Sequence, residues 1–225
     1  MLAGGSGERF GVDLPKQLLP LAGRRMIEHS VAAFEQAPGI DAILVVMVPD
    51  YVKRVADLLA SGGYGKLANV IEGGMTRVDS TRRALAELGD GECDVLLHDA
   101  ARPLIGQETI AACVTALAEW PAVGVTVPSS DTIAMVSGQV MTRMPRRDTL
   151  ARCQTPQAFR LSVIRRAHQL AAADPAFGDS PATDDCGIVL RYLPDVAVHV
   201  VPGSERNIKI TYPADLHVAE TLLRH

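Results

Sequence analysis

Apolar positions along this chain follow two periods, one typical of buried strands and one typical of amphipathic helices. Runs rich in valine and isoleucine alternate with segments in which apolar residues recur every three or four positions. The predicted strands are 42–48, 69–72, 95–97, 123–127 and 196–201. The predicted helices are 51–60, 77–88, 107–119, 161–172, one from Asp184 and one from Pro213. This alternation predicts an α/β fold whose mainly parallel sheet has helices on both faces.

Ligands of such sheets bind at the carboxyl ends of the strands. We therefore expect the glycine-rich start of the chain, Glu72-Gly73-Gly74 and His98-Asp99 to lie close together. Only Met1 and Leu2 precede the glycine-rich segment, so the first strand is either very short or begins upstream of this numbering. We see no internal repeat and no linker, and expect residues 1–225 to form a single domain.

The alternating pattern breaks between residues 129 and 154. Residues 132–136 and 140–144 have the pattern of two strands around Ser137-Gly138, which predicts a hairpin inserted as a protruding arm. In a monomer, such an arm would expose Val136, Val140 and Met141. Burial against a twofold partner would cover these apolar side chains, so the arm favours a homodimer.

Composition narrows the classes of function. The apolar fraction is 48%, and the formal net charge of −4 argues against a general nucleic-acid binder. No apolar run approaches the length of a membrane span, and no secretory signal is visible. The four cysteines lack metal-ligand spacing, which is typical of reduced thiols in the cytoplasm.

The segment Leu2-Ala3-Gly4-Gly5-Ser6-Gly7-Glu8-Arg9, followed by Pro15-Lys16-Gln17, has the character of a phosphate site. Glycines allow backbone N–H groups to close around phosphate oxygens, and Arg9 and Lys16 can neutralise the remaining charge. It is not a Walker loop, because no Lys-Ser/Thr pair follows Gly7, and it lacks the third glycine of the dinucleotide fingerprint. The glycines alone are equally compatible with a surface turn.

Later segments offer further candidates. Asp99 follows a predicted strand and is suited to Mg²⁺, which takes few carboxylates together with phosphate oxygens and water. Arg102 could hold a second phosphate. Alternatively, Asp99 is a helix N-cap and Arg102 is a surface arginine. Gly73, Gly74 and Ser80 could hold a flat base, or form a plain strand-to-helix turn.

Other candidate residues have a structural interpretation as well as a functional one. Lys209 lies in an apolar context, where a lysine usually points to solvent. Asp184 is better explained as a helix cap. The six histidines form no triad or metal set, and His98 is better read as structural than as catalytic.

Taken in order, LAGGSGER, PKQ, EGGMTRVDS, HDAARP, SDT, CQTPQAF, TDD and NIKIT span nearly the whole chain. This ensemble resembles the cytidylyltransferase family that includes the 2-C-methyl-D-erythritol 4-phosphate and ribitol-5-phosphate enzymes. The resemblance implies a Rossmann-like, three-layer α/β fold with a β-arm that swaps across a homodimer. It also implies CTP and a polyol phosphate as partners, Mg²⁺ as cofactor and no nucleic acid or membrane.

The resemblance also implies residue roles. The CTP phosphates would be bound by Ala3, Gly4, Gly5, Ser6, Gly7 and Arg9, and cytosine would be read by Gly74 and Ser80. Lys16 would stabilise the transferring phosphorus, Lys209 would assist at the α-phosphate, and Asp99 would hold Mg²⁺. The polyol phosphate would contact Arg102, Thr132, Arg147 and Thr155, with Thr132 and Arg147 reaching from the partner's arm.

The acceptor stays open between the two branches. The LAGG opening and residues 189–194 favour the ribitol branch, whereas HDAARP and TDD favour the methylerythritol branch. The reaction expected is CTP plus a polyol phosphate giving a CDP-polyol and pyrophosphate. Two alternatives are a sugar-1-phosphate nucleotidyltransferase that uses another nucleotide and a nucleotide-binding regulatory protein without turnover.

Overall fold

The computed structural model describes residues 1–5, 14–179 and 182–224. Its centre is formed by two hydrogen-bonded sheets, ordered β1-β4-β5 and β11-β7-β10-β6. The strands are β1 (Leu2–Ala3), β4 (Ile43–Met47), β5 (Leu67–Glu72), β6 (Asp94–Leu97), β7 (Ala122–Pro128), β10 (Ala151–Arg160) and β11 (Val198–Pro202). A parallel bridge between Leu2 and Asp99 joins the two sheets, so the strands run on as β5-β4-β1-β6-β10-β7-β11.

The central sheet is mainly parallel, as the sequence predicts. Strands β1, β4 and β5 pair in parallel, as do β7 and β11. Strand β10 runs antiparallel to both β6 and β7. The sequence pattern does not predict β10, because Pro156 and the polar residues around it obscure the strand. Its buried polar side chains bond to backbone groups of Ser204 and Cys186 instead of facing an apolar core.

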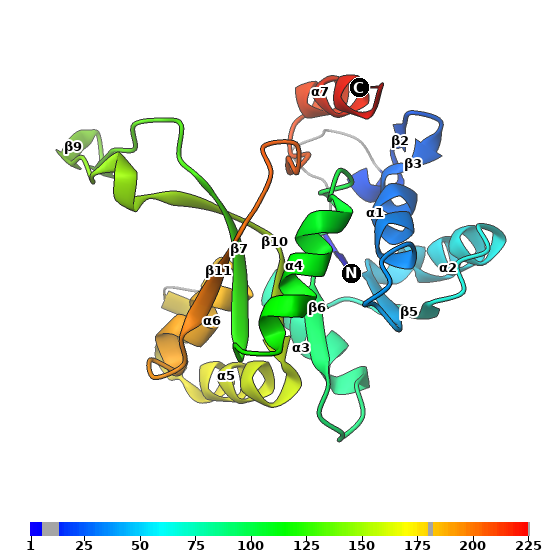
Figure 1. Cartoon of the computed structure of the whole chain (residues 1–225), viewed down its shortest axis with the longest axis horizontal. Coiled ribbons are helices and arrows are strands. Elements are labelled where there is room, and N and C mark those ends of the chain that lie inside the picture. The colour runs from blue at the N-terminus through cyan, green and yellow to red at the C-terminus, as the bar shows by residue number, and fades with distance from the viewer. Residues whose placement is uncertain (6–13, 180–181, 225) are drawn as a thin grey trace.

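Helices cover both faces of the sheet (Figure 1). They are α1 (Met26–Glu35), α2 (Val52–Ser61), α3 (Arg77–Glu87), α4 (Gln107–Leu117), α5 (Leu161–Ala173), α6 (Asp185–Tyr192) and α7 (Pro213–Arg224). Successive strand residues point to opposite faces. Accordingly Val45 packs in the cluster that holds α1 and α2, whereas Val46 packs with Ala84 of α3. Helices α5 and α6 share a cluster with α3, which gives three layers. None of the described helices is long and apolar enough to cross a membrane.

Short elements complete the described chain. They are the hairpins β2 (Pro20–Leu21) with β3 (Arg24–Arg25) and β8 (Met135–Ser137) with β9 (Val140–Arg143), and the 3-10 helices η2 (Lys16–Leu18), η3 (Pro49–Tyr51), η4 (Arg147–Thr149) and η5 (Pro175–Asp179). The apolar pattern of the sequence does not predict α1, β2 or β3.

The predicted hairpin is present at the tip of an arm. Figure 1 shows β8–β9 extending beyond β7 and β10, away from the helices. The strands are shifted from the predicted 132–136 and 140–144 to Met135–Ser137 and Val140–Arg143. Every residue of both strands is exposed, and Val140 keeps 66% of its accessible surface. Here and below, the arm means residues 129–150.

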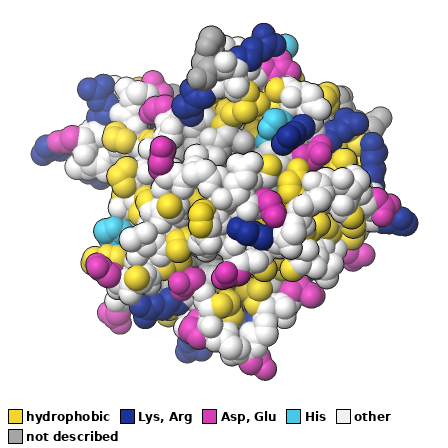
Figure 2. Space-filling model, turned by 45° about the vertical axis from the view of Figure 1, so that its right-hand side comes forward, with side chains coloured by type: hydrophobic (Ala, Val, Ile, Leu, Met, Phe, Trp, Pro, Cys, Tyr) yellow, Lys and Arg dark blue, Asp and Glu magenta, His cyan; other side chains and the backbone are white. Residues whose placement is uncertain are grey.

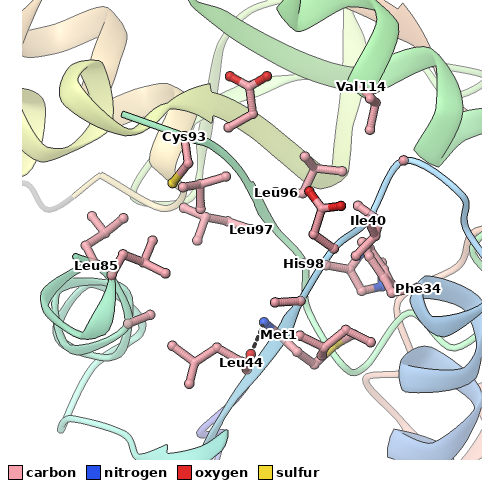
Figure 3. A pocket seen from close by; sticks show the side chains of 18 residues that line it. Met1, Phe34, Ile40, Leu44, Leu85, Cys93, Leu96, Leu97, His98 and Val114 are labelled. Atoms are coloured by element: carbon pink, nitrogen blue, oxygen red, sulfur yellow. Dashed lines mark hydrogen bonds between the residues drawn. The ribbon is translucent and has the colours of Figure 1, made fainter. Parts of the chain in front are cut away.

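A largely apolar cavity of about 580 Å³ lies between β4 and β6. Figure 3 shows Leu44, Leu96 and Phe34 around it, with Met1 at its edge. The backbone nitrogen of Met1 donates to the Leu44 carbonyl at 2.8 Å. The cavity is lined by residues at the starts of β4 and β6, so it lies mainly at the opposite end of the sheet from Asp99.

Candidate active site

Three loops at the carboxyl ends of β1, β5 and β6 meet at Ser80 and Asp99. Ser80 lies in the first turns of α3 and is 3% exposed. A Cβ added to Gly4 would lie 3.0 Å from the Ser80 hydroxyl, as would one added to Gly73. The first glycine-rich segment and the Gly73-Gly74 segment therefore contact one another through a single serine.

The Gly73-Gly74 loop is held by the start of α3. The Gly74 N–H donates to the Ser80 hydroxyl at 3.1 Å, and a Cβ at Gly74 would lie 2.2 Å from that of Asp79. Thr76 caps α3 in a reciprocal capping box with Asp79. Close packing against Asp79 therefore requires glycine at position 74. The Ser80 hydroxyl, which the resemblance assigns to cytosine, accepts the Gly74 N–H in this structure.

Asp99 follows β6 and is 8% exposed. Its Oδ2 accepts a hydrogen bond from Lys209 Nζ at 2.6 Å, and its Oδ1 accepts one from Arg77 Nε at 3.2 Å. Burial alone would raise the pKa of the Asp99 carboxyl, but Arg77 and Lys209 hold it well below its usual range. The carboxylate is therefore ionised, and Asp99 does not cap a helix, since α4 begins after Gly106.

The segment 207–211 brings two lysines to this place. Lys209 turns toward Asp99 instead of lying fully in solvent, and 41% of its side chain is exposed. Lys16 is buried, and its Nζ donates to the Ile210 carbonyl at 2.9 Å. Two cations that are 193 positions apart in sequence are thus tied to the same segment, Lys209 beside Asp99 and Lys16 at the Ile210 carbonyl.

Arg102 and Thr155 bond to the segments around Asp99. Arg102 donates to the carbonyls of Asn207 and Cys153 at 2.8 and 3.3 Å. The Thr155 hydroxyl accepts from the Asp99 backbone N–H at 3.0 Å and contacts His98 Nδ1 at 3.1 Å. Thr155 is buried, so in this structure its hydroxyl supports the loop that carries Asp99.

His98 is a structural residue, as expected. It is fully buried, its Nε2 lies 3.2 Å from the Arg102 carbonyl, and its ring packs against Phe34. Burial lowers its pKa to about 3. The imidazole is therefore neutral near pH 7 and holds the turn that follows β6.

The structure does not gather all of the expected residues. Ala3, Gly4 and Gly5 lie at the end of β1, whereas Ser6, Gly7 and Arg9 fall outside the described residues. Thr132 and Arg147 are exposed on the arm, where Arg147 Nη1 donates to the Ser130 carbonyl at 3.4 Å. Within one chain, the arm that carries these two residues projects away from the body of the molecule (Figure 1).

The sequence motifs do not reveal a buried cluster of charged and polar side chains next to Asp99. Arg77 Nη1 donates to Asp185 Oδ2 at 2.6 Å, and His168 Nε2 contacts Asp185 Oδ1 at 3.1 Å. Asp185 has no exposed surface. Arg77 stands inside EGGMTRVDS and Asp185 inside TDD, but their sequence positions give no sign that the two meet. Asp184 caps α6, as expected.

Charge on the face drawn in Figure 2 is mixed, with acidic and basic side chains interspersed. Among the described residues, no group of three or more histidine, cysteine, aspartate or glutamate side chains could hold a metal ion by itself. A cation at Asp99 would therefore need further oxygen ligands from a bound molecule or from water.

Comparison with known proteins assigns this arrangement to a family. The family model for 2-C-methyl-D-erythritol 4-phosphate cytidylyltransferase, IspD, matches residues 1–225. The chain belongs to the IspD family. It is therefore a nucleotidyltransferase of the cytidylyltransferase class, which confirms the resemblance inferred from the sequence motifs.

Two relatives of this IspD-family chain have names that refer to different acceptors. A 2-C-methyl-D-erythritol 4-phosphate cytidylyltransferase of Thermobifida fusca is 51% identical over 231 residues, covering 100% of this chain and 92% of the relative. The bifunctional ribulose 5-phosphate reductase/CDP-ribitol pyrophosphorylase Bcs1 of Haemophilus influenzae is 37% identical over 228 residues, covering 100% of this chain and 47% of that protein.

Solved structures agree with the fold of this IspD-family chain. The 4-diphosphocytidyl-2C-methyl-D-erythritol synthase of Anaerococcus prevotii superposes with a TM-score of 0.86 at 27% identity, covering 100% of this chain and 94% of that one. The 2-C-methyl-D-erythritol 4-phosphate cytidylyltransferase of Thermus thermophilus gives 0.77 at 29% identity, covering 100% and 97%. The Rossmann-like α/β prediction is therefore confirmed.

Proposed function

We propose that this protein transfers CMP from CTP to 2-C-methyl-D-erythritol 4-phosphate and releases pyrophosphate. The observation that carries the proposal is that the ionised Asp99 bonds to Lys209 after the carboxyl end of β6, while Lys16 bonds to the carbonyl of Ile210, the residue next to Lys209. The methylerythritol acceptor is supported by 51% identity to the Thermobifida fusca enzyme, against 37% to the ribitol-related protein.

In the proposed reaction, an oxygen of the acceptor phosphate attacks the α-phosphorus of CTP. The bond from the α-phosphorus to the oxygen that bridges to the β-phosphate breaks, and pyrophosphate leaves. The acceptor phosphate has a second pKa of about 6 and is largely dianionic at neutral pH, so it needs no general base. Catalysis then rests on in-line positioning and on charge neutralisation by Lys16, Lys209 and Arg9.

The residues at Asp99 fit a Mg²⁺ ion. The carboxylate is ionised, and each of its oxygens accepts one hydrogen bond from a cation among the described residues, while a carboxylate offers about four acceptor sites in all. Asp99 would hold the ion together with nucleotide phosphate oxygens and water. The ion would supply positive charge to the triphosphate.

The other roles are assigned by matching residues to the two substrates. Ala3, Gly4, Gly5, Ser6 and Gly7 would contact the triphosphate, and Gly74 and Ser80 would contact cytosine. Arg102 and Thr155 would contact the acceptor phosphate together with Thr132 and Arg147 from the arm of a second copy. Residues 1–225 would act as one nucleotidyltransferase domain in a homodimer, working in the cytoplasm.

The test is pyrophosphate release from CTP with each acceptor in parallel. We expect the ratio kcat/KM to favour 2-C-methyl-D-erythritol 4-phosphate over D-ribitol 5-phosphate, and CTP over UTP and dTTP. Faster turnover of D-ribitol 5-phosphate would instead favour a second candidate function, transfer of CMP to that acceptor, which the LAGG opening and the Haemophilus relative support. Turnover of a sugar 1-phosphate, or nucleotide binding without turnover, would contradict the proposal.

A further inference from the structure

A line of alternating charges runs from the surface at Lys209 to the buried Asp185. Asp99 bonds to Lys209 through one carboxylate oxygen and to Arg77 through the other, and Arg77 bonds in turn to Asp185. We propose that Arg77 is a positioning residue, anchored by Asp185, that fixes the Asp99 carboxylate for a metal-bound triphosphate. The inference rests on the proposed function, because it takes Asp99 to be the metal-holding carboxylate.

The two basic side chains that bond to the Asp99 carboxylate differ in how far they are exposed. Lys209 binds Oδ2, and 41% of its side chain is exposed, whereas Arg77 binds Oδ1 with 23% exposed. Lys209 can therefore move toward incoming phosphates, while Arg77 stays behind the carboxylate. With Arg77 in place, one oxygen of Asp99 keeps its partner when the other changes partner.

Arg77 reaches the two carboxylates with different nitrogens. Nε donates to Asp99 at 3.2 Å, and Nη1 donates to Asp185 at 2.6 Å. A planar guanidinium fixes the angle between such bonds, whereas the single ammonium of lysine offers no fixed fork. Burial alone would lower the pKa of Arg77, but Asp185 and Asp99 raise it above its usual value, so the bridge is permanently charged.

Asp185 is itself held rigidly. Its backbone N–H donates to Gln157 Oε1 at 3.0 Å, and its Oδ1 contacts His168 Nε2 at 3.1 Å. It lies at the first position of α6, directly after the capping residue Asp184. Strand β10 and helices α5 and α6 therefore all brace the far end of the Arg77 bridge.

This bridge costs desolvation energy that an apolar packing would avoid. Buried ion pairs are often replaceable by hydrophobic residues without loss of stability. A gain in folding stability is therefore a weak explanation for Asp185, the second carboxylate that bonds to Arg77. A better explanation is that Asp185 holds Arg77, and through it the Asp99 carboxylate, in one orientation, since groups that bond to a metal-binding side chain set its geometry.

The experiment compares Arg77→Lys and Asp185→Asn with the wild type, using Arg83→Lys as the matched control. Arg83 lies on the same helix, α3, and its side chain is half exposed beside Glu72. Three measurements are made on each full-length chain: Mn²⁺ binding in the presence of CTP by electron paramagnetic resonance, the Mg²⁺ dependence of pyrophosphate release, and the midpoint of thermal unfolding.

We expect Arg77→Lys to weaken Mn²⁺ binding and to raise the half-saturating Mg²⁺ concentration by about 10-fold, the usual scale for such supporting residues. Asp185→Asn should shift both values in the same direction, and kcat should recover substantially at saturating Mg²⁺. Arg83→Lys should match the wild type. A purely structural role would lower the unfolding midpoint and leave the metal dependence of the remaining folded enzyme unchanged.

Folded variants with wild-type metal dependence would overturn the proposal, as would failure of both variants to fold, because Arg77 would then be structural. If the wild type shows no CMP transfer, the proposed function fails. The Mn²⁺ measurement still decides the positioning role in that case, since it requires only the protein, CTP and the metal.

Discussion

The Asp99 region and the arm distribute their residues in opposite ways. Around Asp99, two carboxylates and two basic side chains lie within and at the edge of the protein interior, where charges are costly. On the arm, apolar side chains project into solvent, and Val136, Val140 and Met141 each keep more than half of their surface exposed. The Asp99 region thus buries charged groups that are usually exposed, and the arm exposes apolar groups that are usually buried.

The two departures have the same physical meaning. The charges at Asp99 neutralise one another in this chain, and we propose that they exchange partners when a nucleoside triphosphate binds. The apolar side chains of the arm are exposed, and an exposed apolar patch is typical of a protein contact. We propose the first region as the site for a charged small molecule and the second as the contact for a second copy of the chain.

The largest expected effect belongs to the Asp99 region. Lys16→Ala should lower kcat by on the order of 10²-fold or more, because it removes the cation that we propose contacts the transferring phosphate. Steady-state pyrophosphate release measures the effect. Lys53→Ala is the control, since Lys53 is highly exposed and forms an ion pair with Asp57 one turn further along α2. Near-normal turnover of folded Lys16→Ala would refute the assignment.

Asp99→Asn should lower activity by about 10-fold or more and raise the apparent Mg²⁺ requirement, because it keeps the shape of the side chain but removes its charge. Titration of turnover with Mg²⁺ checks this prediction. Asp57→Asn on the exposed face of α2 controls for the loss of a carboxylate. An unchanged titration would mean that Asp99 only shapes the loop.

The arm prediction separates the two regions directly. Lys16→Ala and Arg147→Ala should each be inactive alone, and mixing them should restore about a quarter of wild-type activity, because half of the dimers are mixed and one of their two sites is intact. Activity after subunit exchange is the measurement. Arg146→Ala, an exposed neighbour on the arm, should stay active by itself. Strict monomers by sedimentation, or no recovery, would refute the shared site.

The smallest effect concerns stability and pH. The pKa of His98 is about 3 in the folded chain against a usual 6.5. As the pH falls from 6.5 toward 3, the unfolded chain takes up a proton that the folded chain refuses, so the free energy of unfolding decreases. The slope from this group is at most about 1.4 kcal/mol per pH unit.

Urea unfolding between pH 4 and 6.5 tests this contribution. His98→Gln should show a shallower dependence on pH than the wild type, whereas the exposed His217→Gln should keep the wild-type slope. Equal slopes for all three chains would show that His98 titrates normally in the folded state.

Much of the fold was predictable because its signals are local. Val45 and its neighbours form a continuous apolar run, and Val78, Leu85 and Leu88 repeat at helical spacing. Strand β10 was not predictable, because its buried Gln154, Thr155 and Gln157 are satisfied by partners distant in sequence. The arm was located by the break in the pattern, but its strands were shifted by up to three residues at their starts.

The sequence by itself determined the α/β order, the phosphate-type loops and the identity of Asp99, Lys16 and Lys209 as candidates. The tertiary structure alone decided that Lys209 meets Asp99, that the Thr155 hydroxyl supports the Asp99 loop, and that Arg77 joins Asp99 to Asp185. The physical reason is range. Helix and strand patterns depend on neighbours a few positions away, whereas ion pairs in a buried site join residues 22 to 110 positions apart, which only the packing of the whole sheet brings into contact.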